Sequence, residues 1–283
     1  MREIAVKIGQ PIPLTGIITQ PNSFDASKPA IVILNSGLMH HIGTCRLSVK
    51  LARQLADSGF LSIRFDFSGL GDSAPRRGTS SYRESILEEL KEVLDYLQQT
   101  KGINKFICYG LCSGAHASYE FSQVDQRVVA IAQIDPYCYR TWKWYLRHYG
   151  PRLLKLKVWL HFFTRRLKSK QKPKDLSDSD DADNFIKPNY PLEYPERSEV
   201  ANGLKIIVDR GINIYCIFTG GQTEVFNYKS QFRECFYDVN FKQLLTDEYY
   251  PEMNHIITHP YSQKMVINNI CAWINRISNN TQG

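Results

Sequence analysis

Residues 105–117 read Lys-Phe-Ile-Cys-Tyr-Gly-Leu-Cys-Ser-Gly-Ala-His-Ala, a pattern typical of a buried strand that runs through a sharp turn into a helix. Cys112 lies midway between Gly110 and Gly114. So tight a turn has no room for larger side chains at those two positions, and it holds the residue between them in a strained and exposed conformation. The pattern therefore predicts a nucleophile elbow with Cys112 as the nucleophile.

Two alternatives to this interpretation are open. A frame shifted by one residue makes Ser113 the nucleophile, but it places Leu111 and Ala115 at the crowded positions, and leucine is too large for the turn. The pentapeptide also occurs by chance, in which case Cys112 is a small core residue. We prefer Cys112 as the nucleophile, because a helix N-terminus and a nearby histidine favour the thiolate form of a cysteine.

Apolar runs alternate with amphipathic segments along most of the chain. Runs such as 30–34 and 128–134 indicate strands buried on both faces, and their alternation with helices is typical of a parallel sheet. Residues 4–8 and 14–18 instead predict an antiparallel hairpin. We therefore expect an α/β fold with a mostly parallel sheet flanked by helices. Further strands are expected at 61–66, 105–111, 212–218 and 245–250, and helices at 46–58, 82–99, 199–210 and 262–277, besides the helix that follows the elbow.

Residues 137–198 break this alternation, and they are predicted to form an inserted helical lid over the strand ends. The core is then formed by residues 1–136 and 199–283. The segment 140–174 carries twelve Lys and Arg residues and no acid, so the rest of the chain has a net charge of −5 against +7 for the whole. Basicity confined to one segment argues against nucleic-acid binding. Its interleaved aromatic residues suit either peripheral contact with an anionic membrane or a solvated lid.

The cysteines and the N-terminal sequence indicate the cellular compartment of the protein. Seven cysteines at irregular spacing, without a Cys-x-x-Cys pair, argue against a disulfide framework or a structural zinc site. The N-terminus has no apolar signal-like segment, and no stretch approaches the roughly 18 uninterrupted apolar residues of a membrane span. We expect a cytoplasmic protein, which lies peripherally at the inner membrane if the lid binds lipid.

A nucleophile at such an elbow requires an acid and then a histidine from later loops. His255 lies between the last predicted strand and the last helix, and it is the predicted general base. Glu224 follows the strand at 212–218 and is our preferred triad acid, with Asp135 as the alternative. The backbone N–H groups of Ser113, Gly37 and Leu38 are the candidate oxyanion donors, the last two because the loop after residues 30–34 supplies the second donor.

His40 and His41 follow Gly37 and Leu38 closely in the sequence, and as adjacent histidines they are candidate metal ligands. Adjacent histidines on an extended backbone point to opposite sides, and neither has a carboxylate or cysteine neighbour in the sequence. We therefore expect no metal and no cofactor. Asp66 and Asp72 belong to a glycine-rich turn, and they are expected to accept backbone N–H groups rather than to act in catalysis.

The chain resembles the α/β-hydrolase superfamily throughout its length. It resembles more closely the hydrolases associated with bacterial exosortase A systems, which are encoded beside exopolysaccharide genes. This resemblance implies a hydrolase with a cysteine in the elbow and a role near envelope or polysaccharide metabolism. Asn35-Ser36-Gly37 departs from the superfamily, which often has His-Gly there. The resemblance is carried by Gly37 to Gly43, Arg64 to Ser73, Gly110 to Ala115, Tyr139 to Arg152, and Thr219 to Tyr228.

The sequence thus predicts a serine-hydrolase-like acyl hydrolase of esterase or thioesterase type. In this hypothesis His255 deprotonates Cys112, the triad acid orients His255, and the thiolate attacks the carbonyl of a small-molecule or lipid-like acyl substrate. An acyltransferase that uses the same triad is one alternative. A non-catalytic scaffold that binds a membrane or an anionic polymer through the lid is the other.

Overall fold

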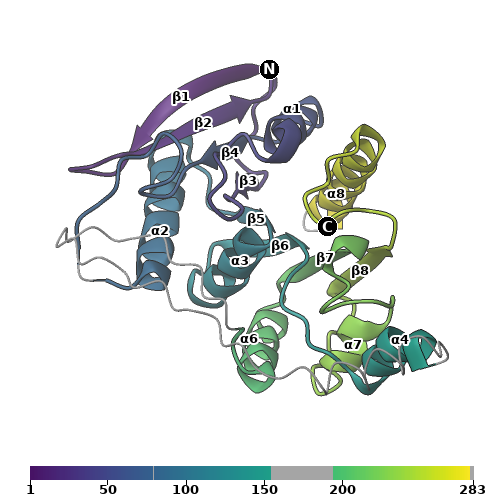
Figure 1. Ribbon diagram of the computed structural model, residues 1–283. Coiled ribbons are helices and arrows are strands. Elements are labelled where there is room, and N and C mark those ends of the chain that lie inside the picture. The colour runs from purple at the N-terminus through teal and green to yellow at the C-terminus, as the bar shows by residue number, and fades with distance from the viewer. Residues whose placement is uncertain (79, 154–193, 281–283) are drawn as a thin grey trace.

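A central sheet of eight strands organises the molecule, in the order β1-β2-β4-β3-β5-β6-β7-β8 (Figure 1). The computed structural model describes residues 1–78, 80–153 and 194–280. The mostly parallel sheet confirms the predicted fold class, and every predicted strand is present. The strands are β1 (Arg2–Ile8), β2 (Leu14–Gln20), β3 (Ala30–Ile33), β4 (Ser62–Phe65), β5 (Phe106–Leu111), β6 (Val128–Ile134), β7 (Asn213–Thr219) and β8 (Leu245–Tyr250).

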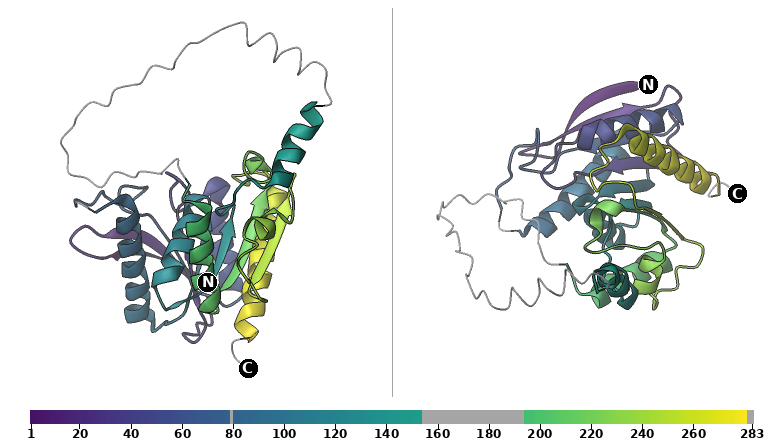
Figure 2. Two further views of the ribbon diagram at one scale, coloured as in Figure 1. Left: turned by 90° about the horizontal axis from the view of Figure 1, so that it is seen from below. Right: turned by 45° about the vertical axis from the view of Figure 1, so that its right-hand side comes forward.

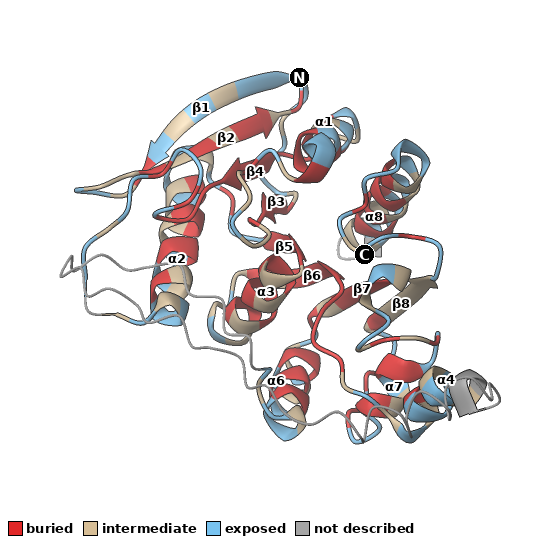
Figure 3. Ribbon diagram, viewed as in Figure 1, coloured by how far each residue is buried: buried red, intermediate tan, exposed pale blue. Residues whose placement is uncertain are grey.

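The two strand patterns of the sequence correspond to two kinds of pairing. β1 and β2 form the predicted antiparallel hairpin, in which Ile4 pairs with Ile18, and β2 is also antiparallel to β4. All other neighbours in the sheet are parallel. β3 to β6 are almost wholly buried, as continuous apolar runs predict for parallel strands covered on both faces (Figure 3).

Helices cover both faces of the sheet and close two apolar cores. α1 and α8 lie on one face of the sheet, and α2, α3 and α6 lie on the other (Figure 1). The buried side chains of the two groups belong to separate apolar clusters. α2 begins with the predicted capping box, in which Ser81 and Glu84 each bond the other's backbone N–H. The helices are α1 (Leu47–Asp57), α2 (Tyr82–Lys101), α3 (Ser113–Val124), α4 (Trp142–Leu153), α6 (Arg197–Asp209), α7 (Gln231–Cys235) and α8 (Pro260–Asn280), with 3-10 turns η1 (Thr44–Arg46) and η2 (Gly220–Gln222).

α4 is the described helix that lies wholly within the predicted lid, and it projects beyond the sheet (Figure 2). Its Trp144 is buried and donates from Nε1 to the carbonyl oxygen of Thr223 at 3.1 Å. Lys143 at its N-terminal end pairs with Glu234 of α7 at 2.8 Å. Residues 154–193, which make up most of the predicted lid and include much of its basic segment, lie outside the described residues, so the boundaries 137–198 stay a prediction.

All seven cysteines are free, in agreement with the expectation that the chain has no disulfide framework. None of the helices within the described ranges is long and apolar enough to cross a membrane.

Candidate active site

The elbow between β5 and α3 has the geometry that its sequence predicts. Cys112 adopts φ 55° and ψ −116°, a conformation that costs a non-glycine residue energy. A Cβ on Gly110 would lie 2.1 Å from the carbonyl carbon and oxygen of Gly114, and a Cβ on Gly114 would lie 2.5 Å from the carbonyl oxygen of Asn35. Both positions therefore require glycine. The Cys112 N–H donates to the carbonyl oxygen of Ile134 at 2.9 Å, which fixes the elbow to β6.

His255 lies beside this elbow and pairs with Asp135. Its Nδ1 is 2.6 Å from Oδ2 of Asp135, which follows β6 directly. The Asp135 carboxylate is buried and accepts two further hydrogen bonds from Thr219, one from the backbone N–H and one from the hydroxyl, each at 2.7 Å. Asp135 is thus fixed from β7, and it fixes His255 in turn.

The protonation of His255 follows from these contacts. Burial lowers the pKa of His255, but the hydrogen bonds with Asp135 and Cys112 outweigh burial and raise the pKa to about 9. With Nδ1 held by Asp135, Nε2 is the nitrogen left for the Cys112 thiol. His255 therefore retains its second ring proton near neutral pH, as an imidazolium beside a cysteine does.

Glu224, our preferred acid, does not contact His255. Its side chain is exposed, and its backbone carbonyl oxygen accepts a hydrogen bond of 2.8 Å from Nε of Arg140. After β7 the chain turns through η2, which carries Glu224 away from the histidine. The preference for Glu224 over Asp135 is wrong in this geometry, because Asp135 follows β6, which is adjacent to β7, and its carboxylate bonds His255.

The candidate oxyanion donors divide into two groups. The Gly37 N–H donates to the Ser113 hydroxyl oxygen at 2.7 Å, so it is already engaged. Within residues 1–78, 80–153 and 194–280, neither the Ser113 N–H nor the Leu38 N–H donates to another protein group. Ser113 and Leu38 thus remain the candidate donors, and the Ser113 hydroxyl is turned toward the loop after β3.

The sequence reasoning missed the function of Thr219-Gly220-Gly221. Thr219 holds Asp135, as described above. A Cβ on Gly221 would lie 2.2 Å from the backbone nitrogen of His255, and one on Gly220 would lie 1.8 Å from the Pro251 carbonyl oxygen. The two glycines therefore let the histidine loop approach β7. A threonine and two glycines at the end of a buried strand were the available signal.

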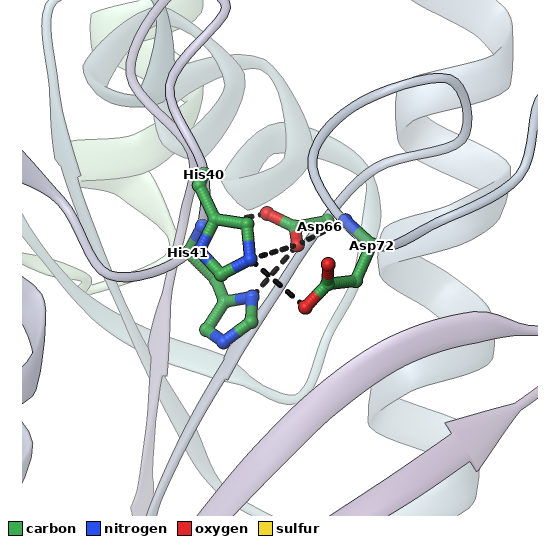
Figure 4. A group of neighbouring side chains, drawn as sticks. All are labelled: His40, His41, Asp66 and Asp72. Atoms are coloured by element: carbon green, nitrogen blue, oxygen red, sulfur yellow. Dashed lines mark hydrogen bonds and ion pairs between the residues drawn. The ribbon is translucent and has the colours of Figure 1, made fainter.

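His40 and His41 contradict the expectation that their side chains diverge. Their rings lie 3.8 Å apart between centroids and both face Asp66 and Asp72 (Figure 4). The backbone is not extended here, because the Gly43 N–H bonds back to the His40 carbonyl oxygen at 2.9 Å. His41 Nδ1 is 2.7 Å from Asp66 Oδ2, and His40 Nε2 is 2.9 Å from Asp72 Oδ2.

Asp66 behaves as predicted and Asp72 does not. The buried Asp66 carboxylate accepts the backbone N–H groups of His41 and Asp72, at 2.6 and 3.0 Å. Burial raises the pKa of Asp66, but hydrogen bonds from His41, the Asp72 N–H and Asn35 outweigh it and hold the pKa below its usual value. The Asp72 side chain bonds His40 instead of a loop N–H.

Comparison with known proteins identifies the fold. A family model described as serine aminopeptidase, S33, matches residues 26–199, which is more than half of the chain. No curated protein matches the sequence. Among solved structures, Est1E from Butyrivibrio proteoclasticus is 13% identical, with a TM-score of 0.60 over 96% of this chain and 98% of that one.

Two further solved structures agree. The esterase Pf2001 from Pyrococcus furiosus is 17% identical, with a TM-score of 0.55 over 97% of this chain and 91% of that one. A sugar hydrolase (YeeB) from Lactococcus lactis is 15% identical, with a TM-score of 0.60 over 99% of both chains. At such low identity these neighbours show the α/β-hydrolase fold, with no indication of a shared substrate.

Replacing Gly110 by Ala should destabilise the protein by about 2 kcal/mol, because the added methyl group overlaps backbone atoms that cannot rotate away. Urea denaturation followed by circular dichroism measures the change. Gly150→Ala is the matched control, since no atom lies within 4 Å of a Cβ at that position in α4. Equal unfolding midpoints for the two variants would contradict the close contact at the elbow.

Replacing Asp135 by Asn should lower the melting temperature most near pH 6 and progressively less as the pH rises. The folded-state pKa of His255 is raised from 6.5 to about 9, so its pair with Asp135 contributes stability that is fully present below 6.5 and is lost as the pH rises through about 9. Thermal denaturation from about pH 6 to about pH 10 measures this effect. Glu224→Gln should change nothing over that range, and a constant deficit for Asp135→Asn would contradict the ion pair.

Proposed function

Because the chain belongs to the serine aminopeptidase S33 family of α/β-hydrolases, we propose that it is an acyl hydrolase whose nucleophile is Cys112. The observation that carries the proposal is the continuous contact from Cys112 through His255 to Asp135. It unites a strained, partly accessible thiol at the start of a helix with a histidine that a buried carboxylate holds. We accordingly assign Asp135, and not Glu224, as the triad acid.

The proposed reaction has two halves. Sγ of Cys112, whose proton is already on Nε2 of His255 as the raised pKa of His255 requires, bonds to the substrate carbonyl carbon, and the N–H groups of Ser113 and Leu38 bind the oxyanion. When the tetrahedral intermediate collapses, the bond to the leaving group breaks and His255 returns the proton to that group. Water then gives a proton to His255 and attacks the acyl-enzyme thioester, which releases a carboxylic acid and the free thiol.

The acyl substrate is proposed as a class. An ester or a thioester suits the arrangement, because either one forms the same thioester on Cys112 and leaves with a proton from His255. Acyl transfer is the variant in which an alcohol or thiol replaces water in the second half. The link to exopolysaccharide or envelope metabolism rests on the sequence resemblance to exosortase-associated hydrolases.

The reactivity of Cys112 tests the catalytic proposal. Cys45 is exposed whereas Cys112 is only partly so, and the other five cysteines are buried. Exposure alone would make Cys45 the faster of the two toward iodoacetamide. An activated thiol predicts instead that Cys112 reacts about tenfold faster or more near pH 7, as measured by peptide mass spectrometry over time.

Variants of the triad residues test whether His255 and Asp135 cause the reactivity of Cys112. His255→Ala and Asp135→Asn should slow the alkylation of Cys112 and leave that of Cys45 unchanged, and Glu224→Gln should affect neither. Turnover of p-nitrophenyl acetate and of an acyl-thioester should fall about 100-fold or more in Cys112→Ala and in Asp135→Asn. Equal labelling of Cys45 and Cys112, or an adduct on Ser113 with a fluorophosphonate, would contradict Cys112 as the nucleophile.

Peripheral contact with a membrane is a second candidate function, and the surface of α4 favours it. Four large apolar or aromatic side chains of this helix are exposed, and Lys143 and Arg147 lie among them. Such a helix can lie at an anionic lipid surface with its aromatic rings at headgroup depth. The exposed side chains are Trp142, Tyr145, Leu146 and Tyr149.

Vesicle sedimentation tests this contact. The protein should bind vesicles rich in phosphatidylglycerol and release at high salt, because the attraction is partly electrostatic. Replacing Trp142 and Leu146 together by Ser should weaken binding about thirtyfold or more, since each apolar side chain inserted in lipid contributes on the order of 1 kcal/mol or more. Tyr237→Ser is the control, because Tyr237 is 81% exposed elsewhere on the surface. Equal loss in both variants, or no binding by the unaltered protein, would refute the contact.

A further inference from the structure

The loops after β3 and β4 bring four metal-ligating side chains together (Figure 4). His40 and His41 come from the first loop, and Asp66 and Asp72 come from the second. One nitrogen or oxygen of each side chain lies within 4.8 Å of those of the other three. These atoms are Nε2 of His40, Nδ1 of His41, and Oδ2 of each aspartate.

The donor set suits a borderline transition-metal ion. Two imidazole nitrogens and two carboxylate oxygens are ligands that Zn²⁺ accepts in tetrahedral sites, whereas Mg²⁺ and Ca²⁺ favour oxygen alone. Two carboxylate ligands supply two negative charges, which a divalent cation balances. Without an ion, the same four side chains are joined by hydrogen bonds, from His40 to Asp72 and from His41 to Asp66.

The surroundings hold the cluster in shape. Asp66 Oδ1 accepts hydrogen bonds from the side chain of Asn35 and from the His41 N–H, at 2.9 and 2.6 Å, so its Oδ2 stays directed at the two rings. Outer contacts of this kind orient carboxylate ligands in metal sites. Gly71 has φ +47°, and a Cβ there would lie 2.3 Å from Asp66 Oδ2 and 2.7 Å from His40 Cδ2. The absence of a side chain at Gly71 is thus what leaves room for the cluster.

We propose that His40, His41, Asp66 and Asp72 bind one divalent transition-metal ion, of which Zn²⁺ is the type. Four protein ligands close the coordination sphere, so the ion is structural, and it joins the loop that carries Gly37 and Leu38 to the turn after β4. Ligand atoms around tetrahedral Zn²⁺ lie roughly 3.3 Å apart. Three separations in the cluster are 2.7, 2.9 and 3.6 Å, and all six lie within 4.8 Å, so binding requires the side chains to shift by about 1 Å.

The proton on the His40 ring must move to the other ring nitrogen when the ion binds. At present the Ile42 N–H approaches His40 Nδ1 at 3.3 Å, which leaves the proton on Nε2. A metal on Nε2 moves the proton to Nδ1, which then faces the Ile42 N–H, so these two donors must move apart. The hydrogen bond lost in this way is long and therefore weak.

Equilibrium dialysis of the full chain against Zn²⁺, followed by elemental analysis, tests the site. A Cys112→Ala background is used for all samples, since the thiol beside His255 is itself a potential zinc ligand. We expect about one zinc ion per chain and a melting temperature that rises with zinc concentration, because the ion binds the folded state. Co²⁺ should compete with zinc and give the visible spectrum of a four-coordinate site, and Mg²⁺ should not compete.

Asp72→Asn and His40→Gln should each weaken zinc binding about tenfold or more and abolish the rise in melting temperature. The Asp72 side chain is 61% exposed, so its variant should fold normally without metal. Asp57→Asn and His259→Gln are the matched controls, since both residues are exposed and lie outside the cluster. Absence of stoichiometric zinc, or unchanged affinity in Asp72→Asn, would overturn the proposal and leave the cluster as a hydrogen-bonded link between the loops.

Discussion

The geometry of the site depends on the contact between Gly110 of β5 and the carbonyl group of Gly114 in α3. No Cβ fits between these two backbones, and their approach forces Cys112 into its positive φ. The same approach seats Gly114 against the carbonyl oxygen of Asn35, so the loop after β3 is located by the elbow as well. One steric constraint thus positions both the thiol and the loop that faces it.

Asn35 extends this constraint to the next loop. Its side-chain amide donates to the Met39 carbonyl oxygen at 2.7 Å and to Asp66 at 2.9 Å, and its oxygen accepts the Phe67 N–H at 3.0 Å. All three of these partner groups lie in loops, outside the hydrogen-bond ladders of the sheet. The departure from a His-Gly pattern at this position therefore has a structural reason, since an amide can donate and accept at once.

A buried charge holds the other side of the site. Asp135 has little access to solvent, and burial of an ionised carboxylate is costly unless hydrogen bonds and a cation compensate. Thr219 supplies two hydrogen bonds and His255 supplies the cation. The histidine loop can come this close only because Gly220 and Gly221 have no side chains. The charge of Asp135 is therefore compensated only because the backbone of the histidine loop can approach β7 closely.

The parts of the molecule that the sequence predicted are those whose causes are local. The strands, the capping box at Ser81 and the elbow each follow from residues within a few positions of one another. The triad acid does not, because the pairing of Asp135 with His255 depends on β6 lying beside β7, a neighbourhood formed by residues far apart in the chain. His40 and His41 were misjudged for a related reason, since a turn closed by Gly43 and an aspartate from another loop decide where their rings point.

Leu38 shows how these constraints combine at the point where chemistry is proposed. It lies in a turn closed by the Met39 N–H and the Ser36 carbonyl oxygen at 3.0 Å, and Gly37 supplies the φ of +56° that this turn requires. On one side Gly37 is bonded to Ser113, and on the other His41 is bonded to Asp66. The Leu38 N–H is thus held between two anchored neighbours without a partner of its own in the described chain. A donor fixed in advance of the reaction stabilises a developing oxyanion more than one that must reorient, because no reorganisation opposes it.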